Sequence, residues 1–138
     1  MRFLSMIRVD ETTGQVPSEQ LMADMGRLIE ELTRTGQLVS TAGLRPAAEG
    51  VRVRLHRGGS FSVVDGPFTE AKEVLGGYWM INVKSREEAI AWAKKCPASE
   101  NEIIEIRQVQ EMADFSEEVQ QAAKGFEELQ KGNAHKAR

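Results

Sequence analysis

The groups best suited to chemistry gather in one short segment, DGPFTEAKEVLGG, at residues 65–77. Asp65 could act as a general base or pair with a ligand, while Glu70 and Lys72 could bind or protonate a small substrate. Asp-Gly-Pro is also typical of a turn, in which the aspartate accepts backbone N–H groups a few residues further on. A charged loop, for its part, is usually just solvated. Asp65 and Glu70 are the catalytic candidates, with the turn role favoured for Asp65 and ligand contact for Glu70 and Lys72.

A second set of candidates consists of arginines. A guanidinium group can bind a carboxylate or phosphate through two parallel hydrogen bonds. The residues considered for this role are Arg8, Arg45, Arg54 and Arg107. We include Arg8 and Arg45 in the candidate ligand site. The alternative, and the commoner use of such residues, is pairing within the fold with Glu105 or Glu49.

The histidines and the cysteine point to structural roles. We expect His56 on the exposed polar side of a hairpin, and Cys96, just before Pro97, as a small buried hydrophobe rather than a reactive thiol. One cysteine excludes an internal disulfide and fits a reducing cytoplasm, and with two histidines it argues against a zinc site. Nucleotide-binding glycine motifs and nucleophile elbows are also missing. We therefore expect neither a metal nor a cofactor.

Length and charge limit the class of protein further. The 138 residues suffice for one domain, and the net charge of −3 argues against a nucleic-acid partner, which needs a basic surface. No apolar run reaches the ~20 residues that span a bilayer, and the first residues lack a signal-peptide pattern, so we expect a cytoplasmic protein with no membrane partner.

Alternation of apolar and polar residues predicts the strands that must position these groups. Ser18 and Ser85 are predicted N-caps of two helices, the first beginning at Glu19 and stopped by Gly36, the second running from Arg86 to about Lys95. The predicted strands cover residues 2–9, 37–44, 51–56, 61–64, 78–84 and 102–109. Those at 51–56 and 61–64 form a hairpin around an RGGS turn.

Three glycines fall at places where their role is open. Gly26 in the first helix marks either close backbone packing or a tolerated surface glycine. Gly76 and Gly77, before the strand at 78–84, are either hinge-like or allow a close backbone approach.

The order of elements predicts an α+β fold of the ferredoxin-like, split βαβ type. An antiparallel sheet would carry helices on one face, with an extra hairpin and a C-terminal helix. The other face mixes apolar residues with charges, which suits an interface with a partly wet cleft, so we expect a homodimer. Its apolar members are Leu4, Met6, Tyr78, Met80 and Ile103.

The C-terminal part is predicted to be separate from this domain. We expect the ferredoxin-like domain at residues 1–110, a helical extension at 111–131 and a flexible tail at 132–138. An amphipathic helix over 116–131 would pack through Phe115 and other apolar residues on one stripe, namely Val119, Ala122, Phe126 and Leu129.

The segment DGPFTEAKEVLGGYWMI, with TAGLRP upstream and AIAWAKKCPA downstream, resembles the DGPF subgroup of the YCII-related family over about residues 1–109. The resemblance implies a ferredoxin-like fold that forms a dimeric α/β barrel. Most members have no assigned function, many are encoded near extracytoplasmic-function sigma factors, and a few related proteins are lyase-like or dehalogenating enzymes. A histidine in the first helix, paired with an aspartate, has been proposed as an acid–base dyad in the wider family. This chain departs from that pattern, because the matching stretch around Met25 and Gly26 contains no histidine.

Two functions from different classes remain open. In the first, a small molecule binds in the cleft of the homodimer, lined by Asp65, Glu70, Lys72 and arginines, and any catalysis is lyase-like or acid–base chemistry without metal. In the second, the chain is a non-catalytic protein-interaction or regulatory module associated with a sigma factor. We favour small-molecule binding.

Overall fold

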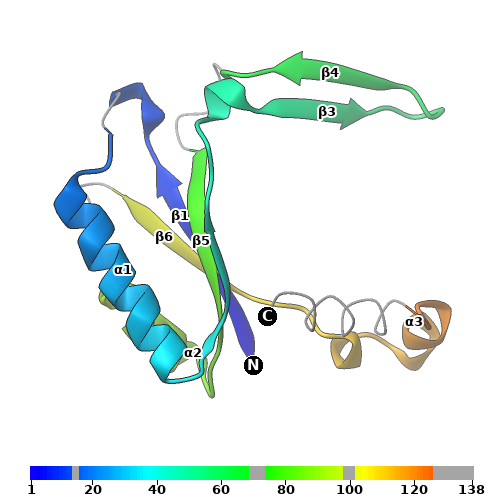
Figure 1. Cartoon of the computed structure of the whole chain (residues 1–138). Helices are drawn as coiled ribbons and strands as arrows, with labels where there is room; N and C mark the ends of the chain where they lie inside the picture. Colours follow the sequence, from blue (N-terminus) through cyan, green and yellow to red (C-terminus); the bar gives the residue numbers. More distant parts are fainter. Residues whose placement is uncertain (14–15, 69–73, 98–101, 126–138) are drawn as a thin grey trace. The chain divides into compact units, whose positions relative to one another are not determined.

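The computed structural model describes residues 1–13, 16–68, 74–97 and 102–125 (Figure 1). The chain divides into two compact units, Met1–Gln108 and Val109–Arg138. None of the helices in these described ranges is long and apolar enough to cross a membrane.

The first unit is built on a four-stranded antiparallel sheet in the order β2-β5-β1-β6. Its strands are β1 (Arg2–Val9), β2 (Leu38–Gly43), β5 (Val74–Asn82) and β6 (Ile103–Gln108). Two helices connect them, α1 (Glu19–Arg34) and α2 (Arg86–Lys94). This mixed α+β arrangement is consistent with the ferredoxin-like fold predicted from the order of elements.

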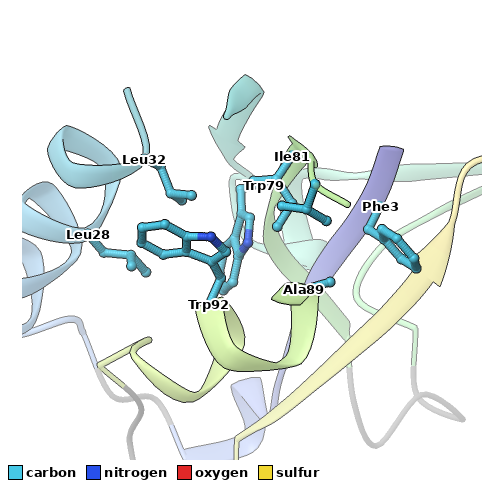
Figure 2. Packing of buried hydrophobic residues seen from close by; sticks show 8 residues of the cluster. Phe3, Leu28, Leu32, Trp79, Ile81, Ala89 and Trp92 are labelled. Carbon is cyan, nitrogen blue, oxygen red and sulfur yellow. The ribbon is translucent and has the colours of Figure 1, made fainter. Parts of the chain in front are cut away.

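Both helices pack on one face of the sheet, where the core lies (Figure 2). Phe3, Trp79 and Ile81 alternate with outward-facing residues along β1 and β5, as the period of two in a strand requires. They meet four residues of the helices, Leu28 and Leu32 of α1 and Ala89 and Trp92 of α2. Both tryptophans of the chain, Trp79 and Trp92, therefore belong to the core.

The helix ends follow the sequence signals. The Ser18 hydroxyl accepts a hydrogen bond from the Leu21 N–H, and the Ser85 hydroxyl accepts one from the Glu88 N–H, each at 3.1 Å. Gly36, with φ +73°, follows the last turn of α1. A left-handed conformation of this kind suits glycine, which has no Cβ, so the predicted caps and stop are confirmed.

The extra hairpin forms a two-stranded sheet of its own, from β3 (Val51–Leu55) and β4 (Phe61–Asp65). Its register pairs Val53 with Val63, and every residue of the two strands is exposed. The hairpin itself is predicted from the sequence. The sequence did not predict that both of its faces would be exposed.

Two glycine assignments are resolved by the surrounding backbone. Strand β5 begins at Val74, four residues earlier than predicted, so Gly76 and Gly77 lie within the strand and are not a hinge. A Cβ at Gly77 would lie 3.0 Å from the Ala42 carbonyl oxygen, and one at Gly76 would lie 3.0 Å from the Val9 methyl groups. Both glycines therefore allow a close approach. Gly26 has open space around it and is a tolerated surface glycine.

In the second unit, the predicted helix over 116–131 is wrong in extent. The described helix, α3 (Glu117–Ala122), covers six residues and is preceded by a single 3-10 turn at Met112–Asp114. Gly125, with φ +102°, follows α3 in a conformation that ends helices. Phe115 and Val119 are exposed, while Phe126 and Leu129 lie outside the described residues.

Candidate functional site

An open pocket of about 580 Å³ lies at the foot of the hairpin, within the first unit. Its volume falls in the range of small-molecule sites. Three segments line it: the connection from β2 to β3, the start of the hairpin, and the chain around the beginning of β5. The lining residues are Leu44, Arg45, Pro46, Ala47, Glu49, Gly50, Arg52, Phe68, Val74 and Leu75.

Close backbone packing holds these segments together. The Leu44 N–H donates to the Gly76 carbonyl at 2.8 Å, and the Gly66 N–H donates to the Gly50 carbonyl at 2.9 Å. A Cβ at Gly66 would overlap the carbonyl oxygen of Ala47, in the 3-10 turn η2 (Ala47–Glu49). The glycine of the Asp-Gly-Pro sequence is thus required for the turn to lie against η2 and form the pocket wall.

The start of η2 is also tied to the N-terminal part of the unit. The Ala47 N–H donates to both carboxylate oxygens of Glu11, at 3.2 and 3.0 Å. Glu11 begins the 3-10 turn η1 (Glu11–Thr13) that follows β1. The pocket wall is therefore anchored from two directions, by the glycine contact and by this carboxylate.

The charged lining residues of the pocket are two arginines, Arg45 and Arg52, and one glutamate, Glu49. Arg45 forms a two-point ion pair with Glu49, one bond being Nη2 to Oε1 at 2.8 Å and the other joining Nε to Oε2. The pair lowers the pKa of Glu49 and raises the pKa of Arg45. The Arg52 guanidinium carbon lies 3.8 Å from the centre of the Phe68 ring, a cation–π contact that orients its N–H groups.

This arrangement is suited to holding an anion that also has an apolar part. The guanidinium groups offer N–H donors in a planar fork, and Leu44, Phe68 and Leu75 offer apolar surface. Glu49 is the titratable acid among the described lining residues, and Arg45 keeps it ionised. A carboxylate held in this way is a poor proton donor, so the described geometry supports binding better than acid–base chemistry.

The predicted site residues do not come together as one site. Arg45 lines the pocket, whereas Glu70 and Lys72 lie outside the described residues. Asp65 is the last residue of β4, opposite Val51, and is exposed outside the pocket lining. No group in the described ranges donates a hydrogen bond to its carboxylate, but residues 69–73 lie outside those ranges, so the turn role favoured for Asp65 stays a prediction.

Arg8 lies away from the pocket, on the sheet face opposite the helices. Its Nη1 is 3.2 Å from Glu105 Oε1, so the alternative of pairing between strands holds for Arg8. The same alternative holds for Arg45 and Glu49, although that pair also borders the pocket.

Of the two remaining predictions from residue type, the exposure of His56 is confirmed, and Cys96 is partly rather than fully buried. His56 is exposed, and its Nε2 lies 3.0 Å from the Ser62 hydroxyl on the same face of the hairpin. Cys96 packs against the core, and burial, with a smaller effect from Glu102, raises the pKa of its thiol to about 11. At neutral pH this thiol is protonated and a weak nucleophile.

Sequence reasoning missed Arg52 and Phe68. Alternation places Arg52 on the polar face of the hairpin with Arg54, and only Arg52 is close enough to the foot to meet the phenylalanine of the motif. The positions of the two residues in the sequence could have indicated their contact. Arg52 is the arginine next to the start of β3, and Phe68 follows the turn after β4.

The fold and the pocket define the class of protein: an α+β domain with a ferredoxin-like sheet and a ligand-sized hollow beside an inserted hairpin. Residues 1–113 match the YCII-related domain, so the chain belongs to the YCII-related family. It is also 34% identical over 76 residues to an uncharacterized protein of Rhizobium meliloti (strain 1021). That match covers 55% of this chain, which spans 60% of the length of the curated relative.

Proposed function

We propose that this YCII-related domain binds a small organic anion in the pocket at the foot of the hairpin. The observation that carries the proposal is the pair of guanidinium groups, Arg45 and Arg52, above an apolar lining that includes Phe68. Either group could hydrogen-bond a carboxylate or phosphate, and the lining suits a ligand with an apolar ring or short chain. Glu70 and Lys72 stand in the sequence between two lining residues, and we propose them as further ligand contacts.

Within this proposal the domain is a member of the DGPF subgroup and works as a homodimer. Support comes from the sheet face opposite the helices, where Leu4 lies directly across from Met80 and Met6 from Tyr78. Contiguous apolar side chains beside charged ones are typical of an interface rather than of a free surface. We assign no reaction, since the described lining offers no acid–base pair.

Calorimetry with benzoate and with inorganic phosphate tests the anion site. Benzoate should bind the full chain more tightly than phosphate, because only benzoate also fills apolar surface. Arg52→Gln should weaken benzoate binding at least tenfold, since a charge-assisted hydrogen bond contributes about 1.5–3 kcal/mol. Failure of the wild-type chain to bind either anion would contradict the proposal and favour the alternative of a protein-interaction module.

Arg54→Gln is the matched control for Arg52→Gln. It removes the same charge from the same face of β3, two residues further along, from a side chain that does not line the pocket. Its benzoate affinity should equal that of the wild type. Equal losses in the two variants would mean that the anion responds to overall charge and not to the pocket.

A further inference from the structure

Glu49 is an acid in the described wall of a pocket that we propose binds anions, and its place there is fixed. The Glu49 N–H donates to the Pro46 carbonyl and the Gly50 N–H to the Ala47 carbonyl, each at 3.0 Å, so the backbone of η2 is held at both ends. The carboxylate accepts two bonds from Arg45, and about half of the Glu49 side chain is accessible to solvent. A carboxylate held in this way presents a negative charge to any ligand that enters the pocket.

The balance of charge in the pocket limits the charge of its ligand. The described lining carries two positive charges, on Arg45 and Arg52, and one negative charge, on Glu49. Repulsion from a carboxylate acts on every negative charge of a ligand, so a dianion is repelled about twice as strongly as a monoanion of the same shape. An acid in this position therefore favours ligands with one negative charge.

The ion pair also limits what Arg45 can hold. Its Nε and one hydrogen of its Nη2 are directed at Glu49, which occupies one edge of the planar guanidinium group. The edge formed by Nη1 and the other Nη2 hydrogen can hold one further carboxylate through two parallel bonds. The single positive charge of Arg45 is then shared between two carboxylates. A second charge on the same ligand would exceed the positive charge that Arg45 supplies.

The apolar part of the lining favours a ligand with a single charged end for a separate reason. The Arg52 guanidinium lies over one face of the Phe68 ring, and Leu44, Val74 and Leu75 add aliphatic surface to the lining. The body of a ligand that fills this surface loses water. A second charge on that body would lose its hydration without gaining a hydrogen bond from these side chains, which is unfavourable.

We infer that Glu49 determines the specificity of this pocket and restricts it to singly charged organic acids, with aromatic or short-chain monocarboxylates as the ligand class. The inference rests on the proposed anion site and adds the charge of the ligand to it. Dicarboxylates and phosphate monoesters are rejected by repulsion, although their shape would fit. Specificity of this kind comes from a repulsive group placed against the wrong ligand, and not from an extra bond to the right one.

Two aromatic acids of similar size test the inference by calorimetry of the full chain at low salt and slightly alkaline pH. Phthalate then carries two negative charges, and its monomethyl ester carries one. The ester should bind the wild type about fivefold more tightly than phthalate, the factor expected for like charges close together in water. In Glu49→Gln, phthalate should bind at least as tightly as the ester, because the repelling charge is gone.

Two further variants separate the charge of Glu49 from other effects. Glu49→Asp keeps the charge on a shorter side chain and should keep the preference for the ester. Glu87→Gln removes one charge from α2, outside the pocket lining, and should also leave the preference unchanged.

The outcomes distinguish this inference from the proposed function on which it rests. Equal binding of phthalate and its ester by the wild type, an unchanged preference in Glu49→Gln, or loss of the preference in Glu49→Asp or Glu87→Gln would overturn the inference. Benzoate binding in the same experiments would leave the anion site standing. A wild type that binds none of the three acids would overturn both.

Discussion

Strand β1 of the four-stranded sheet and strand β4 of the hairpin each carry a phenylalanine, and the two side chains have opposite surroundings. Phe3 is 3% exposed and packs in the core, whereas Phe61 is 65% exposed. Both strands follow the same alternation of apolar and polar residues. The difference lies in what covers the apolar face within the first unit, since α1 and α2 cover the sheet and no described element of that unit covers the hairpin.

The comparison separates a region that buries its apolar residues within its own unit from one whose apolar face stays exposed there. The helices and the sheet bury their apolar residues within one chain, so their stability is a property of the monomer. The hairpin can gain comparable burial only from a surface outside its own unit. The candidate pocket lies where the two regions meet, with Leu44 and Val74 on the sheet side and Arg52 on the hairpin side. A site at such a junction can respond to anything that covers the hairpin.

The largest expected effect comes from replacing each phenylalanine by alanine. Phe3→Ala should lower the free energy of unfolding by about 3–5 kcal/mol, because it removes a buried ring and leaves a cavity. Phe61→Ala should change it by no more than about 0.5 kcal/mol in protein dilute enough to be monomeric, as is usual for exposed sites. Urea denaturation of both variants at low protein concentration makes the measurement. Similar losses for both would mean that the hairpin is packed within its own chain.

The second prediction concerns the junction between the regions. Gly66→Ala should cost about 1–3 kcal/mol, the range for forcing extra volume into a packed place, because its Cβ would overlap the Ala47 carbonyl. It should also weaken benzoate binding, since η2 forms part of the pocket wall. Gly43→Ala is the control, because a Cβ at that strand position meets open space. If Gly66→Ala were as stable as Gly43→Ala, the turn would not be fixed against η2.

The regular part of the fold was predictable because it depends on local signals. Ser18 and Ser85 cap the helices that directly follow them in the sequence. The alternation of apolar and polar residues identifies a strand whether or not another element covers it. The start of β5 and the end of α3 were missed because each depends on backbone geometry at a glycine. At Gly76 and Gly77 the strand passes so close to Val9 and the Ala42 carbonyl that a Cβ would be crowded, and the sequence does not show this contact.

The site was less predictable than the fold, because it is assembled from segments far apart in sequence. Arg45 was identified from its type alone, and its neighbours Arg52 and Phe68 meet only because the chain turns back after β4. Composition could not distinguish Arg52 from Arg54, which has the same type and lies on the same face. Asp65 was assigned to a turn on its Asp-Gly-Pro sequence, and it is the last residue of β4, just before the chain bends at Gly66.

The smallest expected effect is a pH dependence of the stability of the sheet and its helices, caused by Glu88 of α2. Its carboxylate accepts hydrogen bonds from the Lys84 N–H at 2.9 Å and from Gln37 Nε2 at 2.6 Å, and these bonds lower the pKa of Glu88 from its usual 4.5. A carboxylate with a lowered folded-state pKa contributes stability that is fully present above the unfolded-state pKa and is lost as the pH falls through the folded-state value.

Urea midpoints between pH 6 and 3 should therefore fall more steeply for the wild type than for Glu88→Gln, which has no proton to gain. Glu87→Gln removes the same charge from the same first turn, and the Glu87 carboxylate makes no hydrogen bond with any residue that the structure describes. Its acid profile should follow the wild type. A Glu88→Gln profile parallel to the wild type would show that the bonds to Lys84 and Gln37 do not tie α2 to the sheet in solution. The difference between the sheet and the hairpin would then be due to apolar packing alone.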